Sequence, residues 1–447
     1  MQNTTSVSDI EEAINLCREK VDSWRDELKN HSNKEFSAKR LEGGTTHIIW
    51  LCEHSIKDVE PTHVVLRVFQ GSGVNDRDEE ARLSQFLSEK NLGVSILSDF
   101  GTGRVEEFLT GKPLTHKEIA GRSDNPEINW CIAREIGKLH NFDSESPDLK
   151  KYNLTDNGPF MHVSMDNWLS AAQKFDFNDE KWVSASTFNE HKSKLANLIH
   201  IQNKEKWNQE VEWLKDITSH LYRNVHLVLS HNDINAGNVL WEVKKGQTRA
   251  KFIDFEYGGL DYAGFDLGNH FCEHFIDYSV TEWPLFRLKL EHFPQQDYML
   301  KFIEHYMTQR NNISTGKKAL GMYYVKSLFA MLNSHMLWSI WDMVQATSDA
   351  HGLAFLENCI VRMEEYKFHK ETLMKILTDY ADSKGVVDES QNKRVVDALR
   401  QADESEWDLI FNLLNKLHIA SSNRISTSFT MLQEKHFATL TSLGLQA

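Results

Sequence analysis

The spacing of apolar residues predicts a helix and then a set of strands in the first quarter of the chain. Residues 8–28 repeat apolar side chains every three or four positions, which is the pattern of an amphipathic helix. Residues 36–53 and 62–69 are instead rich in β-branched and aromatic residues, as strands are. Helical spacing returns at 77–90, and Gly111 follows the next strand-like stretch. We therefore expect a small β-rich lobe that ends near this glycine.

Helical spacing dominates the rest of the sequence. It occurs at 129–140, 207–221, 322–346 and 407–417. The third of these ranges is the most apolar, but polar residues interrupt it too often for a membrane span. These residues are Lys326, Asn333, His335 and Asp342. The polar stretch 381–394 indicates a linker or a frayed segment before the last helix.

Two short apolar runs in the middle of the chain each have an acidic residue at or near their end. The run HLVLS precedes Asp233, and Asn238 comes five residues after that acid. The run KFIDF carries Asp254, 21 residues after Asp233. This grouping suits phosphoryl transfer, because one Asp can take the proton of an attacking hydroxyl while the Asn and the second Asp hold Mg²⁺ against nucleotide phosphates. The alternative is a pair of acids at surface turns.

Three further features have both a functional and a structural explanation. The turn between the first strands can bring backbone amides close to phosphates, or it can be an ordinary hairpin. It consists of Gly43, Gly44, Thr45 and Thr46. Arg67 lies inside an apolar strand and needs a polar ligand or a partner such as Glu79 or Glu80, unless it reaches solvent from an edge strand. Trp338 and Trp341 share one helical face, where core packing is the alternative to ligand binding.

Composition narrows the classes of function. The 447 residues are 40% apolar and 26% charged, which suits an ordinary soluble protein with a sizeable core. A formal net charge of -15 argues against a nucleic-acid partner and against an anionic membrane surface, and it permits a cationic substrate. The five cysteines form no C-x-x-C pair, and the N-terminus MQNTTSVSDIEEAIN lacks the features of a signal peptide. We therefore expect reduced thiols and a cytoplasmic location.

With these motifs in view, the chain resembles the choline/ethanolamine kinase family, which is itself similar to aminoglycoside phosphotransferases and protein kinases. The resemblance covers residues 41–370 and is most specific in SHND-x4-N and GFDLGNHFCE. The matching stretches are LEGGTTHIIWLC, HVVLRVF, NLGVSILSDFGTGRVEEFL, SHNDINAGNVL, FIDFEYGGLDYAGFDLGNHFCEHFIDYS and LWSIWDMVQA.

The resemblance implies roles for the residues that serve ATP and Mg²⁺. Asp233 is implied to be the base toward the substrate hydroxyl, while Asn238 and Asp254 bind Mg²⁺. Arg67 looks like the family's basic residue over the phosphates, held by Glu80 on the helix that follows.

Two nucleotide-binding segments are implied by the same resemblance. The hinge whose backbone reads the adenine edge consists of Glu107, Phe108 and Leu109. The flexible phosphate loop matches residues 43–47, although the family usually has Ser-Asn where this chain has Thr46 and His47.

The resemblance also implies an amine site of aromatic rings and a carboxylate. Its residues are Glu273, Tyr278, Trp338 and Trp341. A trimethylammonium group cannot donate N–H hydrogen bonds, so aromatic faces and a nearby carboxylate are what bind it. The family has a further tyrosine on the next helix, where this chain has Leu353, Phe355 and Leu356 with a small gap. The motif GFDLGNHFCE and the two tryptophans favour choline, although related ethanolamine enzymes carry tryptophans too.

Following the resemblance, we expect an α/β (α+β) chain with a two-lobed, protein-kinase-like fold. A β-rich ATP-binding lobe with a leading helix is expected at 1–110, a mainly helical catalytic and amine-binding lobe at 111–375, and a C-terminal helical extension without an assigned role at 376–447. The expected function is ATP-dependent phosphorylation of choline, the first step of the cytidine route to phosphatidylcholine. The enzyme is expected to act on a small molecule, and family members are often homodimers.

Three rival functions remain. Ethanolamine kinase uses the same chemistry. Another small-molecule kinase, acting on an aminoglycoside or methylthioribose, is disfavoured by the tryptophan pair and the GNHFCE stretch. A pseudokinase that only binds or scaffolds is disfavoured because Asp233, Asn238 and Asp254 are all intact.

Overall fold

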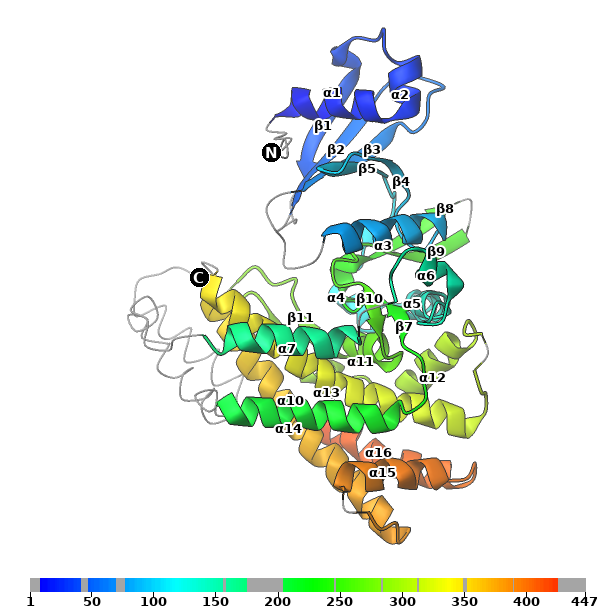
Figure 1. Ribbon diagram of the computed structural model, residues 1–447, viewed down its shortest axis with the longest axis vertical. Coiled ribbons are helices and arrows are strands. Elements are labelled where there is room, and N and C mark those ends of the chain that lie inside the picture. The colour runs from blue at the N-terminus through cyan, green and yellow to red at the C-terminus, as the bar shows by residue number, and fades with distance from the viewer. Residues whose placement is uncertain are drawn as a thin grey trace. The chain divides into compact units, whose positions relative to one another are not determined.

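The computed structural model describes residues 9–41, 47–69, 77–155, 158–174, 204–244, 247–282, 284–311, 313–348, 352–388 and 390–424 (Figure 1). The chain folds into two compact units. The first unit consists of Met1–Pro113, Pro147–Leu154 and Asn238–Gly258, and the second of Leu114–Ser146, Thr155–Gly237 and Gly259–Ala447. Asp233 therefore belongs to the second unit, whereas Asn238 and Asp254 belong to the first.

The first unit is built on a five-stranded antiparallel sheet with the strand order β1-β2-β3-β5-β4. Its strands are β1 (Phe36–Leu41), β2 (His47–His54), β3 (His63–Phe69), β4 (Ile96–Asp99) and β5 (Gly103–Glu107). In β3 every second side chain is buried, namely Val64, Leu66 and Val68. The strands predicted at 36–53 and 62–69 are confirmed.

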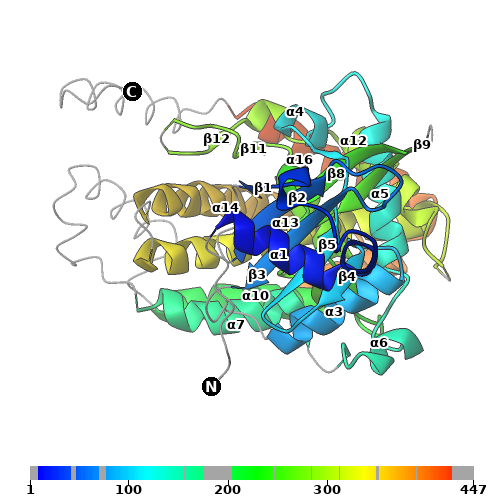
Figure 2. The same ribbon diagram turned by 90° about the horizontal axis from the view of Figure 1, so that it is seen from above.

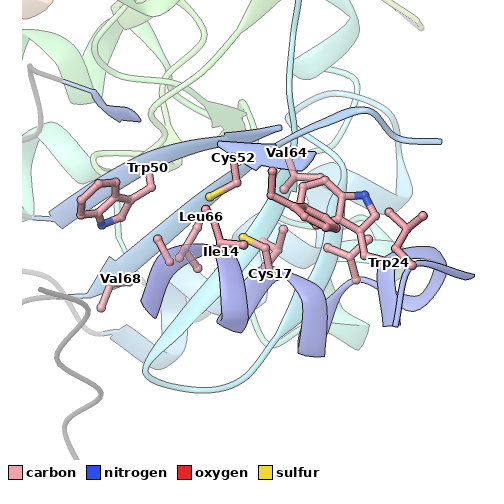
Figure 3. Packing of buried hydrophobic residues seen from close by; sticks show 13 residues of the cluster. Ile14, Cys17, Trp24, Trp50, Cys52, Val64, Leu66 and Val68 are labelled. Carbon is pink, nitrogen blue, oxygen red and sulfur yellow. The ribbon is translucent and has the colours of Figure 1, made fainter. Parts of the chain in front are cut away.

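Two helices pack on the buried face of this sheet: α1 (Ile10–Lys20) and α2 (Asp22–Glu27). The sequence predicted one helix over residues 8–28, which was wrong in two respects. The helix begins after the N-cap Asp9, and the extended backbone of Val21 divides it in two. Cys17 of α1 and Cys52 of β2 both lie in the core between helix and sheet (Figure 3). All five cysteines of the chain are buried free thiols.

A second, three-stranded sheet with the order β6-β8-β9 completes the first unit. The remaining elements of this unit are η1 (Asn33–Glu35), α3 (Arg77–Glu89), β6 (Lys112–Pro113), α6 (Pro147–Lys151), η2 (Ala236–Asn238) at its edge, β8 (Val239–Lys244) and β9 (Gln247–Phe252). Lys251 of β9 donates hydrogen bonds to the backbone and side-chain oxygens of Asn91, just after α3. The β8–β9 hairpin is thereby fixed to the end of that helix.

The second unit is mainly helical. Its helices are α4 (His116–Ile119), α5 (Glu127–Leu139), α7 (Phe160–Ala172), α10 (Lys204–Leu221), α11 (Gly264–Cys272), α12 (Gln296–Met307), α13 (Lys317–Ser348), α14 (Gly352–Ser383), α15 (Gln391–Gln401) and α16 (Glu406–Ser422). Short antiparallel pairs join β7 (Val228–Ser230) to β10 (Gly259–Asp261) and β11 (Ile276–Asp277) to β12 (Arg287–Leu288), and η3 (Leu290–His292) follows. The two longest helices, α13 and α14, run side by side (Figure 1, Figure 2).

Helix α13 is buried because other helices pack around it. It contacts α7, α10, α11, α12, α14 and α16. The approach of α11 is so close that a Cβ atom at Gly268 would lie 2.6 Å from the Cβ of Ala330, so this crossing requires a glycine. In the described part of the chain, no helix is both long and apolar enough to cross a bilayer.

The stretch predicted as a linker or a frayed segment at 381–394 joins two helices, and its described residues between 384 and 390 are not helical. Helix α14 continues to Ser383, and α15 begins at Gln391 after the N-cap Ser390, which accepts a hydrogen bond from the backbone of Lys393. Helix α15 packs on α10 and α14, and α16 packs on α13 and α14. The C-terminal helices are therefore part of the core of the second unit.

Replacement of Trp407 tests this role of α16. The side chain is fully buried, and a Cβ atom at Gly321 of α13 would lie 2.1 Å from its ring. We expect Trp407→Ala to lower the free energy of unfolding by about 3–5 kcal/mol, measured by denaturant titration. Leu409 on the same helix is 53% exposed, so Leu409→Ala should change it by less than about 0.5 kcal/mol. Equal small losses in both variants would contradict the packing.

Candidate active site

The loop after β7 carries Asp233 and is fixed by a buried carboxylate. Asp266 on α11 accepts backbone hydrogen bonds from His231 at 2.9 Å and from Asn232 at 2.7 Å. The ring of His140 lies 3.0 Å from the same carboxylate. Burial alone would raise the pKa of Asp266, but the interaction with His140 and the backbone hydrogen bonds outweigh it and lower that pKa. The next residue along the loop is Asp233, so its backbone position depends on this network.

The side chain of Asp233 is oriented by a nearby amide. Asn235 donates from Nδ2 to Oδ2 of Asp233 at 3.0 Å. The amide oxygen of Asn235 in turn accepts the backbone N–H of Gly237 at 2.9 Å. Asp233 is partly exposed, as a base that meets a substrate must be.

Asn238 and Asp254 lie at the same end of the β8–β9 hairpin. Val239 pairs with Phe252, and the backbone N–H of Ile253 donates to the carbonyl oxygen of Asn238 at 3.0 Å. The backbone of Asp254 is left-handed, with φ 63°, a conformation that Asp tolerates better than most residues. The hairpin register thus brings together an amide and a carboxylate that are well separated in the sequence.

Arg67 of β3 belongs to a network of buried charges. Its Nε lies 3.3 Å from Oε1 of Glu106 on β5, and Glu106 also pairs with Arg104. The sequence pointed to Glu80 as the partner, but Glu80 lies 3.8 Å from Arg104 and acts on Arg67 at longer range. Burial by itself lowers the pKa of an arginine. The nearby acids Glu106, Asp254 and Glu80 outweigh burial and raise the pKa of this guanidinium.

A second acid at the end of the hairpin escaped the sequence analysis. Glu256 comes two residues after Asp254, and burial together with the charges of Asp254 and Glu80 raises its pKa to about 7. The D-x-E spacing in IDFEY was the available signal. Within the described ranges, no three His, Cys, Asp or Glu side chains form a group that could hold a metal ion by themselves. A metal at this hairpin would therefore need other oxygen ligands, such as the amide of Asn238.

The expected hinge leaves the sheet directly after β5. The backbone N–H of Glu107 donates to the carbonyl of Ser95, and its carboxylate accepts the N–H of Ser95 at 3.1 Å. Phe108 is half-exposed and stacks on His63, with ring centroids 5.6 Å apart, while Leu109 is buried. The expected phosphate loop, with Gly43, Gly44, Thr45 and Thr46, lies outside the described residues.

In the second unit, an acid, a guanidinium and a phenol meet at the end of α11. Glu273 is the C-cap of this helix and is 5% exposed. Arg362 of α14 lies 3.6 Å from its carboxylate and donates to the hydroxyl of Tyr278 at 2.6 Å. Burial raises the pKa of Glu273 to about 7, although Arg362 opposes the shift. Tyr278 is 44% exposed, so this cluster has an edge that faces solvent.

The two tryptophans of α13 pack against each other near this cluster. Trp338 donates from its indole N–H to the amide oxygen of Asn269 at 2.8 Å, one turn before Glu273 on α11. The rings of Trp338 and Trp341 lie 5.8 Å apart at 79°, and Phe355 of α14 meets Trp341 edge-on at 5.6 Å. Three aromatic rings are therefore arranged at mutual angles beside a buried acid.

A second buried acid in this region was recognised in the sequence only as an interruption of an apolar run. Asp342 follows Trp341 and is 1% exposed. Its two oxygens lie 3.2 and 2.9 Å from the amide nitrogen of Asn358 on α14. The signal was its helical spacing, because residues four apart, such as Trp338 and Asp342, share one face.

Comparison with known proteins shows the family of the chain. Residues 38–367 match the family described as Choline/ethanolamine kinase. The chain is 28% identical over 378 residues to a probable ethanolamine kinase of Arabidopsis thaliana, covering 82% of this chain and 87% of the relative. It is 25% identical over 379 residues to a choline/ethanolamine kinase of Rattus norvegicus, covering 82% and 88%.

A solved structure supports the fold independently. The choline kinase from Cryptosporidium parvum Iowa II superposes with a TM-score of 0.63 at 22% identity, covering 82% of this chain and 96% of that chain. The predicted fold class, with an N-terminal sheet and a large helical C-terminal part, is confirmed. The family match over residues 38–367 and the fold together show that the chain belongs to the choline/ethanolamine kinase family, and so is a phosphotransferase.

Proposed function

We propose that this kinase phosphorylates choline with ATP to give phosphocholine, the first step of the cytidine route to phosphatidylcholine. The observation that carries the proposal is the pair Trp338 and Trp341 on α13. Trp338 donates its indole N–H to Asn269, which lies one turn before the buried Glu273 on α11. An aromatic face attracts a cation by about 0.5–1 kcal/mol at exposed sites and about 2 kcal/mol when desolvated. Such faces suit a quaternary ammonium group, which has no N–H to donate.

Asp233 is the proposed general base. Its carboxylate is oriented by Asn235 and remains partly exposed, so it can accept the proton of the substrate hydroxyl. The hydrogen bonds to Asp266 hold the backbone of the loop and so limit how far the carboxylate can move. Positioning of this kind is most of what phosphoryl transfer asks of a protein.

The first unit supplies the proposed residues for Mg²⁺ and the nucleotide. Mg²⁺, when bound, neutralises charge on the phosphates of ATP. Asn238 and Asp254 offer the oxygen ligands that Mg²⁺ prefers, and Glu256 adds a second acid nearby. Arg67, which stays charged beside Glu106, is the proposed phosphate-binding cation. The backbone of Glu107, Phe108 and Leu109 is proposed to read the adenine edge, and Gly43, Gly44, Thr45 and Thr46 the phosphates.

Ethanolamine is the second candidate substrate, with the same chemistry. Its ammonium group can donate hydrogen bonds to Glu273, and the relative from Arabidopsis thaliana carries ethanolamine in its name. The family has a tyrosine on the helix after the tryptophans. In this region, the present chain has Phe355, whose ring meets Trp341 and carries no hydroxyl. A coupled ADP-release assay with choline, ethanolamine and monomethylethanolamine would rank the amines. A higher kcat/KM for ethanolamine would replace the proposed substrate, and no turnover of any of them would refute the proposal.

Asp233→Asn tests the base. The amide keeps the shape of the side chain but cannot accept the hydroxyl proton, so kcat should fall by about 10²–10⁴ while ATP still binds. Steady-state kinetics at saturating choline, together with calorimetric titration of ATP, measure the two effects. An unchanged kcat would remove Asp233 from the mechanism.

Asp254→Ala tests the metal site. Loss of a hard-oxygen ligand should weaken MgATP much more than metal-free ATP and abolish turnover. Calorimetric titrations with Mg²⁺ and with EDTA provide the comparison. Glu89→Ala, at an exposed acid of α3 in the same unit, should change neither affinity. If Asp254→Ala weakened both forms of the nucleotide equally, Asp254 would be a structural residue.

Trp341→Ala tests the aromatic site. Loss of the indole face and its contact area should weaken choline by about 1–3 kcal/mol and ethanolamine by less, because ethanolamine has no methyl groups. The measurement is kcat/KM for both amines. Trp213→Ala, at a partly exposed tryptophan of α10 that packs against Lys370, should leave the ratio of the two values unchanged. Equal losses for both amines in Trp341→Ala would mean that this ring only packs.

A further inference from the structure

Next to the tryptophans, the second unit buries a carboxylate that no step described so far uses. We propose that Asp342 is a specificity-determining residue of the amine site, whose carboxylate takes the positive charge of the substrate's ammonium group together with Glu273. This inference rests on the proposed function and adds the group that distinguishes a charged substrate from a neutral one.

The position of Asp342 follows from the helix that carries it. Residues 338, 341 and 342 have the spacing i, i+3, i+4, so both tryptophans and this acid lie on one side of α13. Asp342 is 1% exposed, and the hydrogen-bond partner that the structure gives it is the neutral amide of Asn358. The same side of α14 carries Phe355, which meets Trp341. The acid is thus buried on the side of α13 that carries the two tryptophans.

The charges around Asp342 do not balance without a further cation. Arg362 is engaged by Glu273 at 3.6 Å and by the hydroxyl of Tyr278 at 2.6 Å. One guanidinium therefore faces two buried carboxylates, which leaves one negative charge in excess when both are ionised. Burial raises the pKa of Asp342 to about 8 against the influence of Arg362 and Asn358. An uncompensated buried charge is costly, and a monocationic substrate restores the balance.

Within the part of the chain that the structure describes, the neighbouring elements supply no second cation to this acid. On α14, Arg362 acts on Asp342 electrostatically, and Cys359 is a thiol whose pKa is raised by burial and by the charge of Asp342. Tyr278, after β11, contributes a phenol, and Glu273, at the end of α11, contributes the other acid. Among the described residues, the positive group that these interactions place beside Asp342 is therefore Arg362 alone.

A structural role makes a different prediction. If Asp342 only links α13 to α14 through Asn358, then an asparagine at 342 keeps a side-chain oxygen for that hydrogen bond and should have little effect. If the carboxylate balances the ammonium charge, the same replacement removes the charge and should affect charged ligands selectively.

The decisive experiment compares choline with 3,3-dimethyl-1-butanol, its uncharged carbon isostere, in the full-length enzyme. In Asp342→Asn, the preference for binding choline over the isostere should fall at least about 10-fold, while the KM for ATP stays the same. Glu365→Gln is the matched control, because Glu365 is an equally buried acid of α14 that pairs with Arg424. It should leave the preference unchanged. An unchanged preference in Asp342→Asn would overturn the inference.

The pH dependence gives a second readout. Choline carries a fixed charge, so any change in its affinity with pH comes from the protein. The carboxyl of Asp342 has a raised pKa in the free enzyme and must lose its proton to balance the ammonium charge. Choline should therefore bind more tightly as the pH rises from 6 to 8, and its binding should release protons. In Asp342→Asn, the choline affinity should still change with pH only because of Glu273, whose pKa is about 7. Identical profiles in wild type and variant would contradict the inference.

The outcomes also separate this inference from the proposed function. If the wild-type enzyme phosphorylates neither choline nor ethanolamine, both proposals fail. If it phosphorylates either amine and the preference for charge survives in Asp342→Asn, only the inference fails. Asp342→Ser, which is smaller and also uncharged, provides the same comparison if the asparagine variant does not fold.

Discussion

The functional residues of the second unit depend on how α11 is held. Asp266 in its first turn accepts the backbone hydrogen bonds that fix the loop before Asp233, and breaking such a buried network typically costs about 3–5 kcal/mol. Gly268 in the middle lets the helix approach α13 closely, and Glu273 caps its end. All nine residues of α11 are buried, so the helix cannot shift without disturbing its surroundings. One short helix therefore positions both Asp233, the proposed base, and Glu273, the carboxylate proposed to bind the amine.

Each unit concentrates acids where its proposed ligand is positive. In the first unit, the pairing of Arg67 and Glu106 leaves Asp254 with a further acid, Glu256, close by. Excess negative charge of this kind attracts a hard dication such as Mg²⁺. In the second unit, the excess falls on Asp342 and Glu273, and α13 carries two tryptophans on the same side as Asp342, which suits an ammonium group better than a metal. The two proposed sites therefore differ in the groups near their carboxylates, which are further acids in the first unit and aromatic rings in the second.

Sequence periodicity predicted the elements well, because strands and helices are specified by residues that are near one another along the chain. It placed Asp254 at an apolar, strand-like run for the same reason, and β9 ends two residues before this acid. It failed where the partner comes from a distant segment. The next helix offered Glu79 or Glu80 as the partner of Arg67, and the family resemblance implied Glu80, whereas the sheet register brings in Glu106 from β5. Nothing local indicated that Asn358 would meet Asp342, because that contact requires α13 and α14 to pack side by side. The break at 21 and the helix after 390 depended on single backbone conformations that propensity does not resolve.

The C-terminal helices, beyond the residues that match the family, connect to the proposed amine site through α14. Residues 355, 358, 362, 365 and 369 repeat at intervals of three and four, so they form one continuous stripe along that helix. The first three belong to the aromatic and acidic cluster. Glu365 then binds Arg424 through both carboxylate oxygens at 2.8 and 2.9 Å, and His369 lies 3.3 Å from the hydroxyl of Ser421. Both contacts come after Arg362 along α14 and join this helix to the end of α16 and the residues that follow it. The end of the stripe therefore serves the packing of the C-terminal helices, whereas its beginning belongs to the proposed amine site.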